Sequence, residues 1–289
     1  MKTRVLVLGA TGLLGQAVMR AGHARGHSMR GAARSGADVA IDITDGDALV
    51  ALVTAERPEL IVNCVALVDV MGCERDPGKA YAINAAPVAR LARIASQNGA
   101  RLVHISTDHY FAGEGNMAHG EGATVTLLNQ YAATKYAGEQ FALLCHDALV
   151  LRTSIVGIRG WDAPTFAEWA IAAILRDEAM TLFSDAFTSS IDTGAFADAM
   201  FDLIAADATG LLNVAASQVY SKEAFIRELA TQLNAPLTRA EVGTVGDLTP
   251  PRPKALGLDV ARAEALLQRA LPDMKAVVRA VVCDYRSKT

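Results

Sequence analysis

The sequence predicts an α/β fold, namely a Rossmann-type doubly wound parallel sheet with helices on both faces and a smaller C-terminal substrate lobe. In the first half, short β-rich runs alternate with helix-like stretches, which indicates βαβ units. Some strands are continuous apolar runs, such as Val5–Leu8, which suits strands buried on both faces. A glycine-rich turn follows the first strand and opens the first helix. We expect the Rossmann domain at 1–153. The lobe at 154–289 should return some elements to the main sheet.

The individual elements follow from this alternation. The predicted strands are Arg4–Leu8, Ser28–Ala33, Val39–Ile43, Leu60–Asn63, Arg101–Thr107 and Ala148–Thr153. The predicted helices of this half are Leu13–Ala24, Asp47–Ala55 with Asp45 as its N-cap, Lys79–Gln97 and Gln130–Leu144. After about residue 154 the pattern loosens, because Pro and Gly become frequent. Further helices are predicted at Thr165–Leu175, Thr193–Ala205, Lys222–Leu233 and Ala261–Arg269.

Composition excludes several classes of function. The 289 residues carry a formal net charge of -4, so the chain has no general attraction to nucleic acid or to an anionic membrane. No run of 18 or more apolar residues could span a bilayer, and the N-terminus does not read as a signal peptide. The four cysteines form no CxxC pair and no cluster with zinc-ligand spacing. We therefore expect a cytoplasmic protein without a metal site.

The glycine-rich turn predicts dinucleotide binding. Gly9 permits the tight turn, Gly12 lets the backbone approach a pyrophosphate, and Gly15 lets helix and strand pack closely. The N–H groups and positive dipole end of the following helix would face the phosphates. The spacing G-x-x-G-x-x-G is the variant associated with short-chain dehydrogenases, so domain 1–153 should bind NAD(P). The predicted contacts here are Gly9, Thr11, Gly12, Leu13, Leu14 and Gly15.

The end of the second strand bears on which dinucleotide is bound. A carboxylate there receives the 2′-hydroxyl of NAD, whereas an arginine accommodates the 2′-phosphate of NADP. The chain has Arg34 and no acid at this point, which favours NADP(H). NAD(H) is the alternative cofactor. If Arg34 has no part in binding, it is an ordinary solvated side chain. Asp42, beside Ile43, comes too late to be the ribose carboxylate. It would touch the adenine edge or cap a turn.

Tyr131 and Lys135 form the candidate catalytic pair. They lie four residues apart on a predicted helix and therefore share one face. A phenol is a weak acid with a reference pKa of about 10, and a fixed ammonium favours the phenolate and eases proton transfer. Thr107 ends the fifth strand, at the edge of a parallel sheet where ligands bind, and could hydrogen-bond a substrate oxygen beside Tyr131.

With these segments in view, the chain resembles the extended short-chain dehydrogenases and, within them, the dTDP-4-dehydrorhamnose reductase family. The stretches that carry the resemblance are Gly9–Gly15, Asp42–Asp45, Pro58–Cys64, Cys73-Glu74 with Ala80–Ala85, His104–Asp108, Tyr131–Glu139, Leu151–Thr153 with Gly157, and Arg252-Pro253 with Leu258-Asp259. The resemblance implies NAD(P)H-dependent reduction of a 4-keto group on a nucleotide-linked deoxysugar. It implies that Thr107, Tyr131 and Lys135 are catalytic and that Lys135 also contacts the cofactor. It further implies that Cys64, Val65 and Ala66 pass the cofactor ribose and pyrophosphate.

The chain departs from the family where the family shapes its substrate pocket. His109 replaces the tyrosine that follows Ser-Thr-Asp, and Asp185–Ile191 lacks the family's Gln and its Pro-Thr. The chemistry is therefore better specified than the sugar, and an enzyme that acts on a different nucleotide sugar is at least as well supported as the rhamnose enzyme itself. The residues expected to contact substrate are Thr107, Asp108, His109, Tyr131, Thr153, Ser154 and Arg252.

Two alternatives stay open. An epimerase of the same superfamily would keep NAD bound and recycle it. Dehydration is disfavoured, because His109 stands where dehydratases carry a glutamate after Asp108. A non-catalytic dinucleotide-binding regulatory subunit would have degraded catalytic residues, and these are intact here. The sequence does not fix the oligomeric state and allows a homodimer.

Overall fold

The computed structural model describes residues 2–161, 163–247 and 253–288. The chain divides into two compact units. The first unit comprises Met1–Tyr110, Leu127–Arg152 and Ala197–Leu212, and the second comprises Phe111–Thr126, Thr153–Phe196 and Asn213–Thr289. Both units therefore consist of segments that are distant in the sequence.

The first unit is built on a seven-stranded sheet with the order β12-β7-β5-β4-β1-β2-β3. Its strands are β1 Arg4–Leu8, β2 Ser28–Ala33, β3 Val39–Ala40, β4 Leu60–Asn63, β5 Arg101–Ile105, β7 Leu149–Arg152 and β12 Gly210–Asn213. The pairings among β1, β2, β3, β4, β5 and β7 are parallel. Leu8 lies opposite both Ala32 and Asn63, and Asn63 lies opposite His104. The carboxyl ends of these strands therefore meet at one edge, where doubly wound sheets bind ligands.

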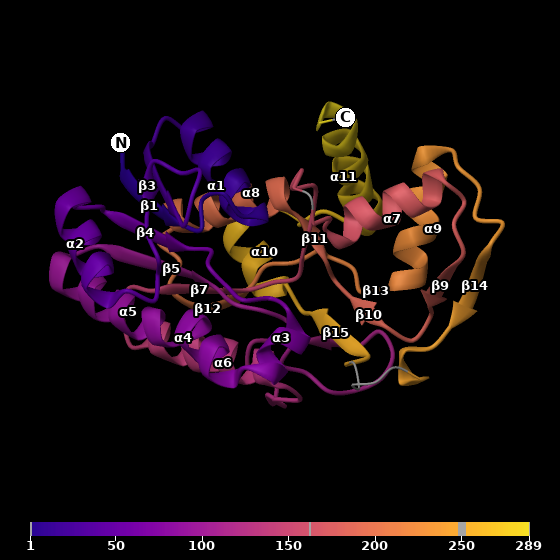
Figure 1. Ribbon diagram of the computed structural model, residues 1–289, viewed down its shortest axis with the longest axis horizontal. Helices are drawn as coiled ribbons and strands as arrows, with labels where there is room; N and C mark the ends of the chain where they lie inside the picture. The colour runs from indigo at the N-terminus through magenta and orange to yellow at the C-terminus, as the bar shows by residue number, and fades with distance from the viewer. Residues whose placement is uncertain (1, 162, 248–252, 289) are drawn as a thin grey trace. The chain divides into compact units, whose positions relative to one another are not determined.

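Helices cover both faces of this sheet (Figure 1). On one face lies α1 (Leu13–Ala24), whose C-cap residue Arg25 forms an ion pair of 2.6 Å with Asp198 of α8 (Thr193–Ala205). On the other face lie α2 (Gly46–Glu56), α5 (Ala86–Asn98) and α6 (Gln130–Leu143), which pack on one another. Burial of their apolar stripes against the strands supplies the main core of the unit.

The second unit has smaller sheets. A four-stranded sheet has the order β13-β10-β15-β6, and the pairs β8–β11 and β9–β14 stand beside it. These strands are β6 Ala118–His119, β8 Ile155–Val156, β9 Met180–Phe183, β10 Phe187–Thr188, β11 Ile191–Asp192, β13 Tyr220–Ser221, β14 Ala240–Gly243 and β15 Ala255–Leu258. Its helices are α7 Phe166–Leu175, α9 Lys222–Leu233, α10 Ala261–Leu267 and α11 Met274–Lys288, with a 3₁₀ turn at Val245–Asp247. A second apolar core joins α7, α9 and α11.

Most predicted elements of the first half are confirmed, several to the residue. The strands Arg4–Leu8, Ser28–Ala33 and Leu60–Asn63 are correct. Asp45 caps α2 as expected, since its Oδ1 accepts bonds from the backbone N–H groups of Asp47 and Ala48 at 3.1 and 3.0 Å.

The predicted helix Lys79–Gln97 is wrong as a single helix. It is two helices, α4 (Pro77–Asn84) and α5, separated at Ala85. Pro87 lies in the first turn of α5, the one place where a helix accepts proline without losing a hydrogen bond. The sequence prediction also missed the short helix α3 (Val70–Arg75) and the last helix, α11.

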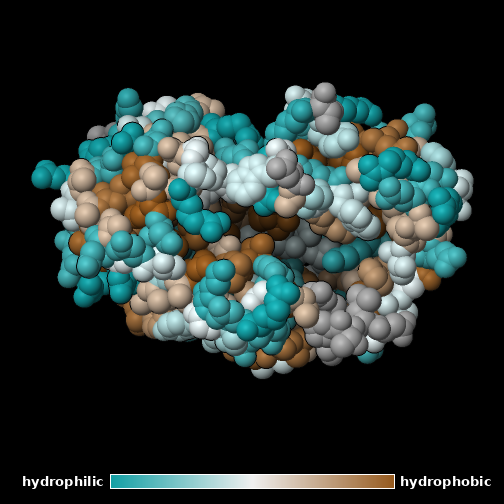
Figure 2. Space-filling view, viewed as in Figure 1, coloured by the Kyte–Doolittle hydropathy of each residue, from teal (hydrophilic) through white to brown (hydrophobic). Residues whose placement is uncertain are grey.

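The surface is mixed in character. Figure 2 shows hydrophilic and hydrophobic residues interspersed over the visible face. Within the described ranges, no helix has both the length and the apolar character needed to cross a membrane.

Candidate active site

The glycine turn has the geometry that its sequence predicts. Gly9 adopts φ +79°, a left-handed conformation that favours glycine, and its N–H donates to Ala32 O at 2.8 Å. A Cβ at Gly15 would lie 2.1 Å from the carbonyl oxygen of Gly9, so the close approach of α1 to the turn requires glycine here. Gly12 is the N-cap of α1 and provides no side-chain cap. The first N–H groups of α1 are therefore left for a ligand of negative charge.

The segment after β4 lies against this turn. A Cβ at Gly9 would lie 3.1 Å from Cγ2 of Val65 and 3.2 Å from the backbone of Cys64. The side chain of Asn63 fixes the segment, because its Oδ1 accepts from the N–H of Val65 at 3.1 Å. Burial raises the pKa of the Cys64 thiol to about 12, so this cysteine stays neutral. Gly9 and the Cys64–Ala66 segment thus share the carboxyl edge of the sheet.

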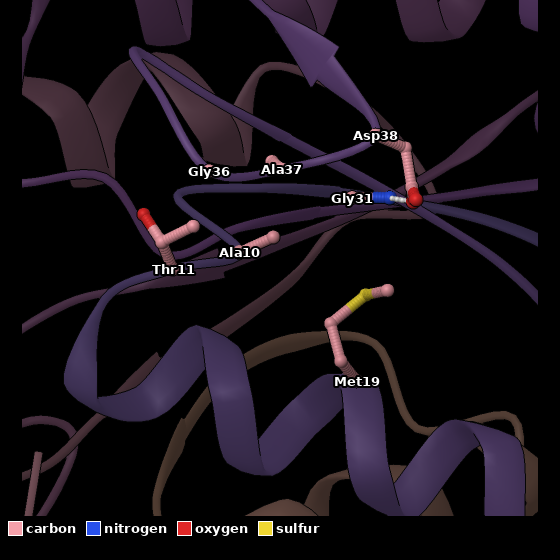
Figure 3. Close-up of a pocket in the computed structure, with 7 residues that line it drawn as sticks. All are labelled: Ala10, Thr11, Met19, Gly31, Gly36, Ala37 and Asp38. Atoms are coloured by element: carbon pink, nitrogen blue, oxygen red, sulfur yellow. Dashed lines mark hydrogen bonds between the residues drawn. The ribbon is translucent and has the colours of Figure 1, made fainter.

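A pocket of about 370 Å³ adjoins the turn (Figure 3). Its lining residues are Ala10, Thr11, Met19, Gly31, Gly36, Ala37 and Asp38. The carboxylate of Asp38 accepts a 2.7 Å hydrogen bond from the N–H of Gly31, which ties the loop between β2 and β3 to β2. This loop contains Arg34, whose side chain is exposed. The sequence prediction missed Asp38, because its contact with Gly31 arises only when the loop folds back.

Asp42 caps a turn, one of its two predicted roles, while its contact with the adenine edge stays a prediction. Its Oδ1 accepts from the N–H and the hydroxyl of Thr44 at 2.9 and 2.8 Å, so it caps a turn. These bonds lower the pKa of Asp42, and the charge of Arg34 lowers it further. Ile43 is buried in the core of the unit. Arg34 and Asp42 therefore lie close enough to influence each other at this end of the sheet.

Tyr131 and Thr107 are brought together by α6 and by the end of β5. Asn129 caps α6 by accepting from the N–H of Ala132 at 2.8 Å, which places Tyr131 in the first turn of the helix. The side chains of Tyr131 and Thr107 are both buried, and Thr107 lies close enough to influence the pKa of Tyr131. Burial raises the pKa of Tyr131 to about 12, while the polar side chain of Thr107 acts in the opposite direction. The phenol is thus a proton donor at neutral pH, and the expected shift toward phenolate does not occur.

Lys135 lies one turn further along α6 and is almost wholly buried. Its Nζ donates a 2.6 Å hydrogen bond to the carbonyl oxygen of Ile105, the last residue of β5. Burial lowers the pKa of Lys135 to about 8, and the charge of Glu139 acts against that change. The influence of Lys135 on Cys64 shows that it also lies near the segment beside the glycine turn. Lys135 therefore lies between the predicted cofactor site at the glycine turn and the predicted catalytic residues Thr107 and Tyr131.

Two of the predicted substrate residues border Tyr131. The His109 and Tyr131 rings meet edge to face, with centroids 5.3 Å apart. Thr107 Oγ1 donates to Asp108 at 3.3 Å and accepts from the N–H of His109 at 3.3 Å. The charge of Asp108 adds to the raised pKa of Tyr131. Thr107, Asp108, His109, Tyr131 and Lys135 thus form one cluster in the first unit.

The remaining predicted substrate residues do not belong to this unit. Thr153 and Ser154 are in the second unit, where the hydroxyls of Ser154, Thr188 and Ser190 form a hydrogen-bonded group. Arg252 lies outside the described residues. Among the described residues, no group of His, Cys, Asp and Glu side chains could hold a metal ion.

Two features of the site were missed or only touched on by the sequence prediction. Asn84 clamps the segment before α3 to α6: its side chain bonds both backbone groups of Leu67, at 2.7 and 3.2 Å, and the hydroxyl of Thr134 at 3.1 Å. Glu139 and Arg152 form a buried ion pair behind Lys135, with 2.6 Å between Oε1 and Nη2. The only sequence signal for this pair is the four-residue spacing of Tyr131, Lys135 and Glu139 along one helix face.

Comparison with known proteins identifies the family. Residues 3–287 match the family described as RmlD substrate binding domain. The chain belongs to this family. The resemblance that its motifs suggested is thereby confirmed.

Individual relatives are similar to this chain along nearly their whole length. The probable low-salt glycan biosynthesis reductase Agl14 of Haloferax volcanii is 31% identical over 296 residues, which cover 97% of this chain and 99% of that protein. The dTDP-4-dehydrorhamnose reductase of Escherichia coli K12 is 28% identical over 298 residues, which cover 99% of each. A crystal structure of the dTDP-4-dehydrorhamnose reductase of Bacillus anthracis with NADP has a TM-score of 0.88 at 24% identity, covering 98% of this chain and 99% of that one. That similarity confirms the fold.

Proposed function

We propose that this chain reduces a 4-keto group on a nucleotide-linked deoxysugar, with NADPH as the preferred cofactor and NADH as the alternative. The observation that carries the proposal is the burial of Thr107 and Tyr131 next to each other, with Lys135, also buried, one helical turn away. The names of the RmlD-family relatives support the reductase reaction and its substrate class. A cytoplasmic location and a homodimer stay predictions from the sequence.

The residues at the carboxyl edge of the sheet fit a dinucleotide. The uncapped N-terminus of α1 suits its pyrophosphate, and the space left by the missing Cβ of Gly12 lets that group approach the backbone. The residues proposed to hold the cofactor are Gly9, Thr11, Gly12, Leu13, Leu14, Gly15, Arg34, Asp42, Ile43, Cys64, Val65, Ala66 and Lys135. When bound, the nicotinamide supplies a hydride. NADP in the Bacillus anthracis relative is consistent with this cofactor.

The side chains of the chain supply the proton and hold the reacting oxygen. As the carbonyl carbon is reduced, negative charge develops on its oxygen, and the protonated phenol of Tyr131 transfers its proton there. Thr107 holds the same oxygen by a hydrogen bond. The ammonium of Lys135 stabilises the phenolate that Tyr131 leaves behind. Asp108, His109, Thr153, Ser154 and Arg252 are proposed to contact the remainder of the substrate.

The assay that tests the function measures NADPH oxidation with a panel of nucleotide-linked sugars. The panel contains 4-keto-6-deoxysugars, including the rhamnose precursor, and matched 4-hydroxy sugars. We expect NADPH to be consumed in proportion to at least one 4-keto sugar. Interconversion of 4-hydroxy sugars without net NADPH consumption would instead identify an epimerase. No turnover of any sugar, with intact dinucleotide binding, would favour the regulatory subunit.

The lowered pKa of Lys135 predicts an alkaline limit to activity. Its ammonium form is present below about pH 8 and is lost as the pH rises through that value. Because the ammonium is the form proposed to stabilise the phenolate, kcat/KM should fall above about pH 8. The measurement is a pH profile of kcat/KM at saturating NADPH. A profile that stays flat until the ordinary lysine pKa of about 10.4 would contradict the role of Lys135.

Arg34 should govern the choice between the two dinucleotides. Removing a charged partner of a phosphate costs about 1.5–3 kcal/mol, so Arg34→Ala should weaken NADPH binding roughly tenfold or more and leave NADH binding unchanged. Dissociation constants from fluorescence titration measure this. Arg30→Ala is the matched control, because Arg30 is on β2, the strand just before Arg34, but pairs with Glu56 at 3.1 Å. An unchanged NADPH-to-NADH ratio in Arg34→Ala would show that Arg34 is only a solvated side chain.

A further inference from the structure

Glu139 is a buried carboxylate that the proposed chemistry does not use. It is fully buried on α6, two turns after Tyr131 and one turn after Lys135. Its Oε1 lies 2.6 Å from Nη2 of Arg152 on β7, and its Oε2 accepts from Nε of Arg152 at 2.9 Å. The guanidinium of Arg152 also lies 5.1 Å from the centroid of the Tyr110 ring. Burial of a carboxylate away from water has a desolvation cost in free energy. The hydrogen bonds and opposite charge of these partners offset that cost.

Glu139 also contacts the segment that follows β5 and contains Thr107. Its Oε2 accepts a 2.8 Å hydrogen bond from Ser106 Oγ, and Ser106 in turn lies 2.9 Å from the hydroxyl of Tyr110. Ser106 is adjacent to Thr107. One carboxylate on α6 therefore ties this helix, which carries Tyr131 and Lys135, to the segment after β5 that contains Thr107.

The charge of Glu139 acts on Lys135 as well. The groups that face Lys135 are Cys64 after β4, His104 on β5 and Glu139 on its own helix. Burial raises the pKa of the Cys64 thiol, and burial together with the charge of Lys135 keeps the pKa of His104 well below its ordinary value, so both are neutral near pH 7. Glu139 is thus the anionic group that supports the buried ammonium, while Arg152 is engaged with Glu139 on β7.

We propose that Glu139 is a positioning residue for the reduction, which keeps Lys135 charged and holds Thr107 in reach of Tyr131 through Ser106. This proposal rests on the proposed function, because it assigns Glu139 a part in that reaction. A purely structural ion pair would predict that its loss lowers stability and nothing else.

Glu139→Gln is the first test, since it keeps the shape and an acceptor for Ser106 but removes the charge. Arg152 is then left buried without its anion, a change that can cost 3–5 kcal/mol in such pairs and could prevent folding. Glu139→Gln with Arg152→Met removes both charges, and replacement of a whole buried pair is often tolerated. Glu139→Asp tests rescue by a shorter carboxylate. Glu168→Gln is the control, because Glu168 is another carboxylate with several hydrogen bonds but belongs to the second unit.

Two measurements decide the matter. The first is the pH profile of kcat and of kcat/KM. The second is the titration of Lys135 by NMR of protein labelled at lysine Cε, with its signal assigned by Lys135→Arg. We expect Glu139→Gln, or the double variant if the single one does not fold, to move the alkaline limb and the NMR midpoint to lower pH by about one unit, the lower end of the effect of an opposite charge. We also expect kcat to fall more than KM changes, and Glu139→Asp to recover part of both.

An unmoved NMR midpoint, or an equal shift in Glu168→Gln, would overturn the proposal. Because NMR does not depend on turnover, the two failures are distinguishable. A shifted Lys135 titration in a chain that reduces no sugar would contradict the proposed function and leave the electrostatic link between Glu139 and Lys135 intact. Normal turnover with an unmoved Lys135 titration would contradict only the role of Glu139.

Discussion

Tyr131→Phe should lower kcat by roughly 10²–10⁴-fold, the usual contribution of a positioned proton donor. The change removes one hydroxyl from a buried ring and nothing else. Because the pKa of Tyr131 is raised to about 12, the lost group is a protonated acid, which is the form needed for reduction. Folding and NADPH binding should survive, so steady-state rates and cofactor titration on the same preparation separate the effects.

Tyr136→Phe provides the matched control for that variant. Tyr136 is on the same helix, five residues on, and its ring packs edge to face on Tyr110 with centroids 5.5 Å apart. Its loss of a hydroxyl should leave kcat near the unmodified value. Near-normal turnover in Tyr131→Phe would remove Tyr131 from the mechanism and revive the regulatory-subunit alternative.

Lys135→Met should damage two steps at once. It keeps most of the length and apolar volume of the side chain and removes the ammonium that bonds Ile105 O at 2.6 Å. We expect kcat to fall by at least about a hundredfold, because the phenolate left by Tyr131 loses its counter-charge, and NADPH affinity to fall as well. Melting temperature should hold or rise, since burial of a charge is costly.

Lys288→Met is the control for this change. The ammonium of Lys288 also donates to a backbone carbonyl, that of Ile158, at 2.6 Å, but it lies on α11 in the second unit. It should change neither kcat nor NADPH affinity. A Lys135→Met enzyme that loses NADPH binding but keeps its kcat at saturating cofactor would restrict Lys135 to holding the cofactor.

The parts of this protein that could be predicted from sequence depend on local pattern. The spacing of Gly9, Gly12 and Gly15 predicts a strand–turn–helix, because each of these positions in the seven-residue turn lacks room for a side chain. Tyr131 and Lys135 could be paired because a helix repeats every 3.6 residues. Reasoning from local pattern also predicted one helix where the structure has two, α4 and α5, which are separated at Ala85. Pro87 was a signal in the sequence that a new helix begins there.

The parts that could not be predicted depend on contacts distant in the chain. Arg152 pairs with Glu139 because α6 packs on β7, and no local pattern encodes that contact. The raised pKa of Tyr131 is a second example, because the sequence does not show how completely the tyrosine side chain is buried. Asp38 is a third, since its bond to Gly31 depends on how the loop after β2 folds back.

The central claim is that hydride and proton are added across a 4-keto group, and transfer of deuterium tests it most directly. NADPH carrying deuterium at the transferable position is incubated with the 4-keto sugar that turns over best, and the product is examined by mass spectrometry and NMR. We predict one deuterium per product, at C4, with one NADPH oxidised for each sugar reduced. Product that lacks deuterium at C4, or sugar converted with no NADPH consumed, would contradict a net reduction and indicate a recycled cofactor.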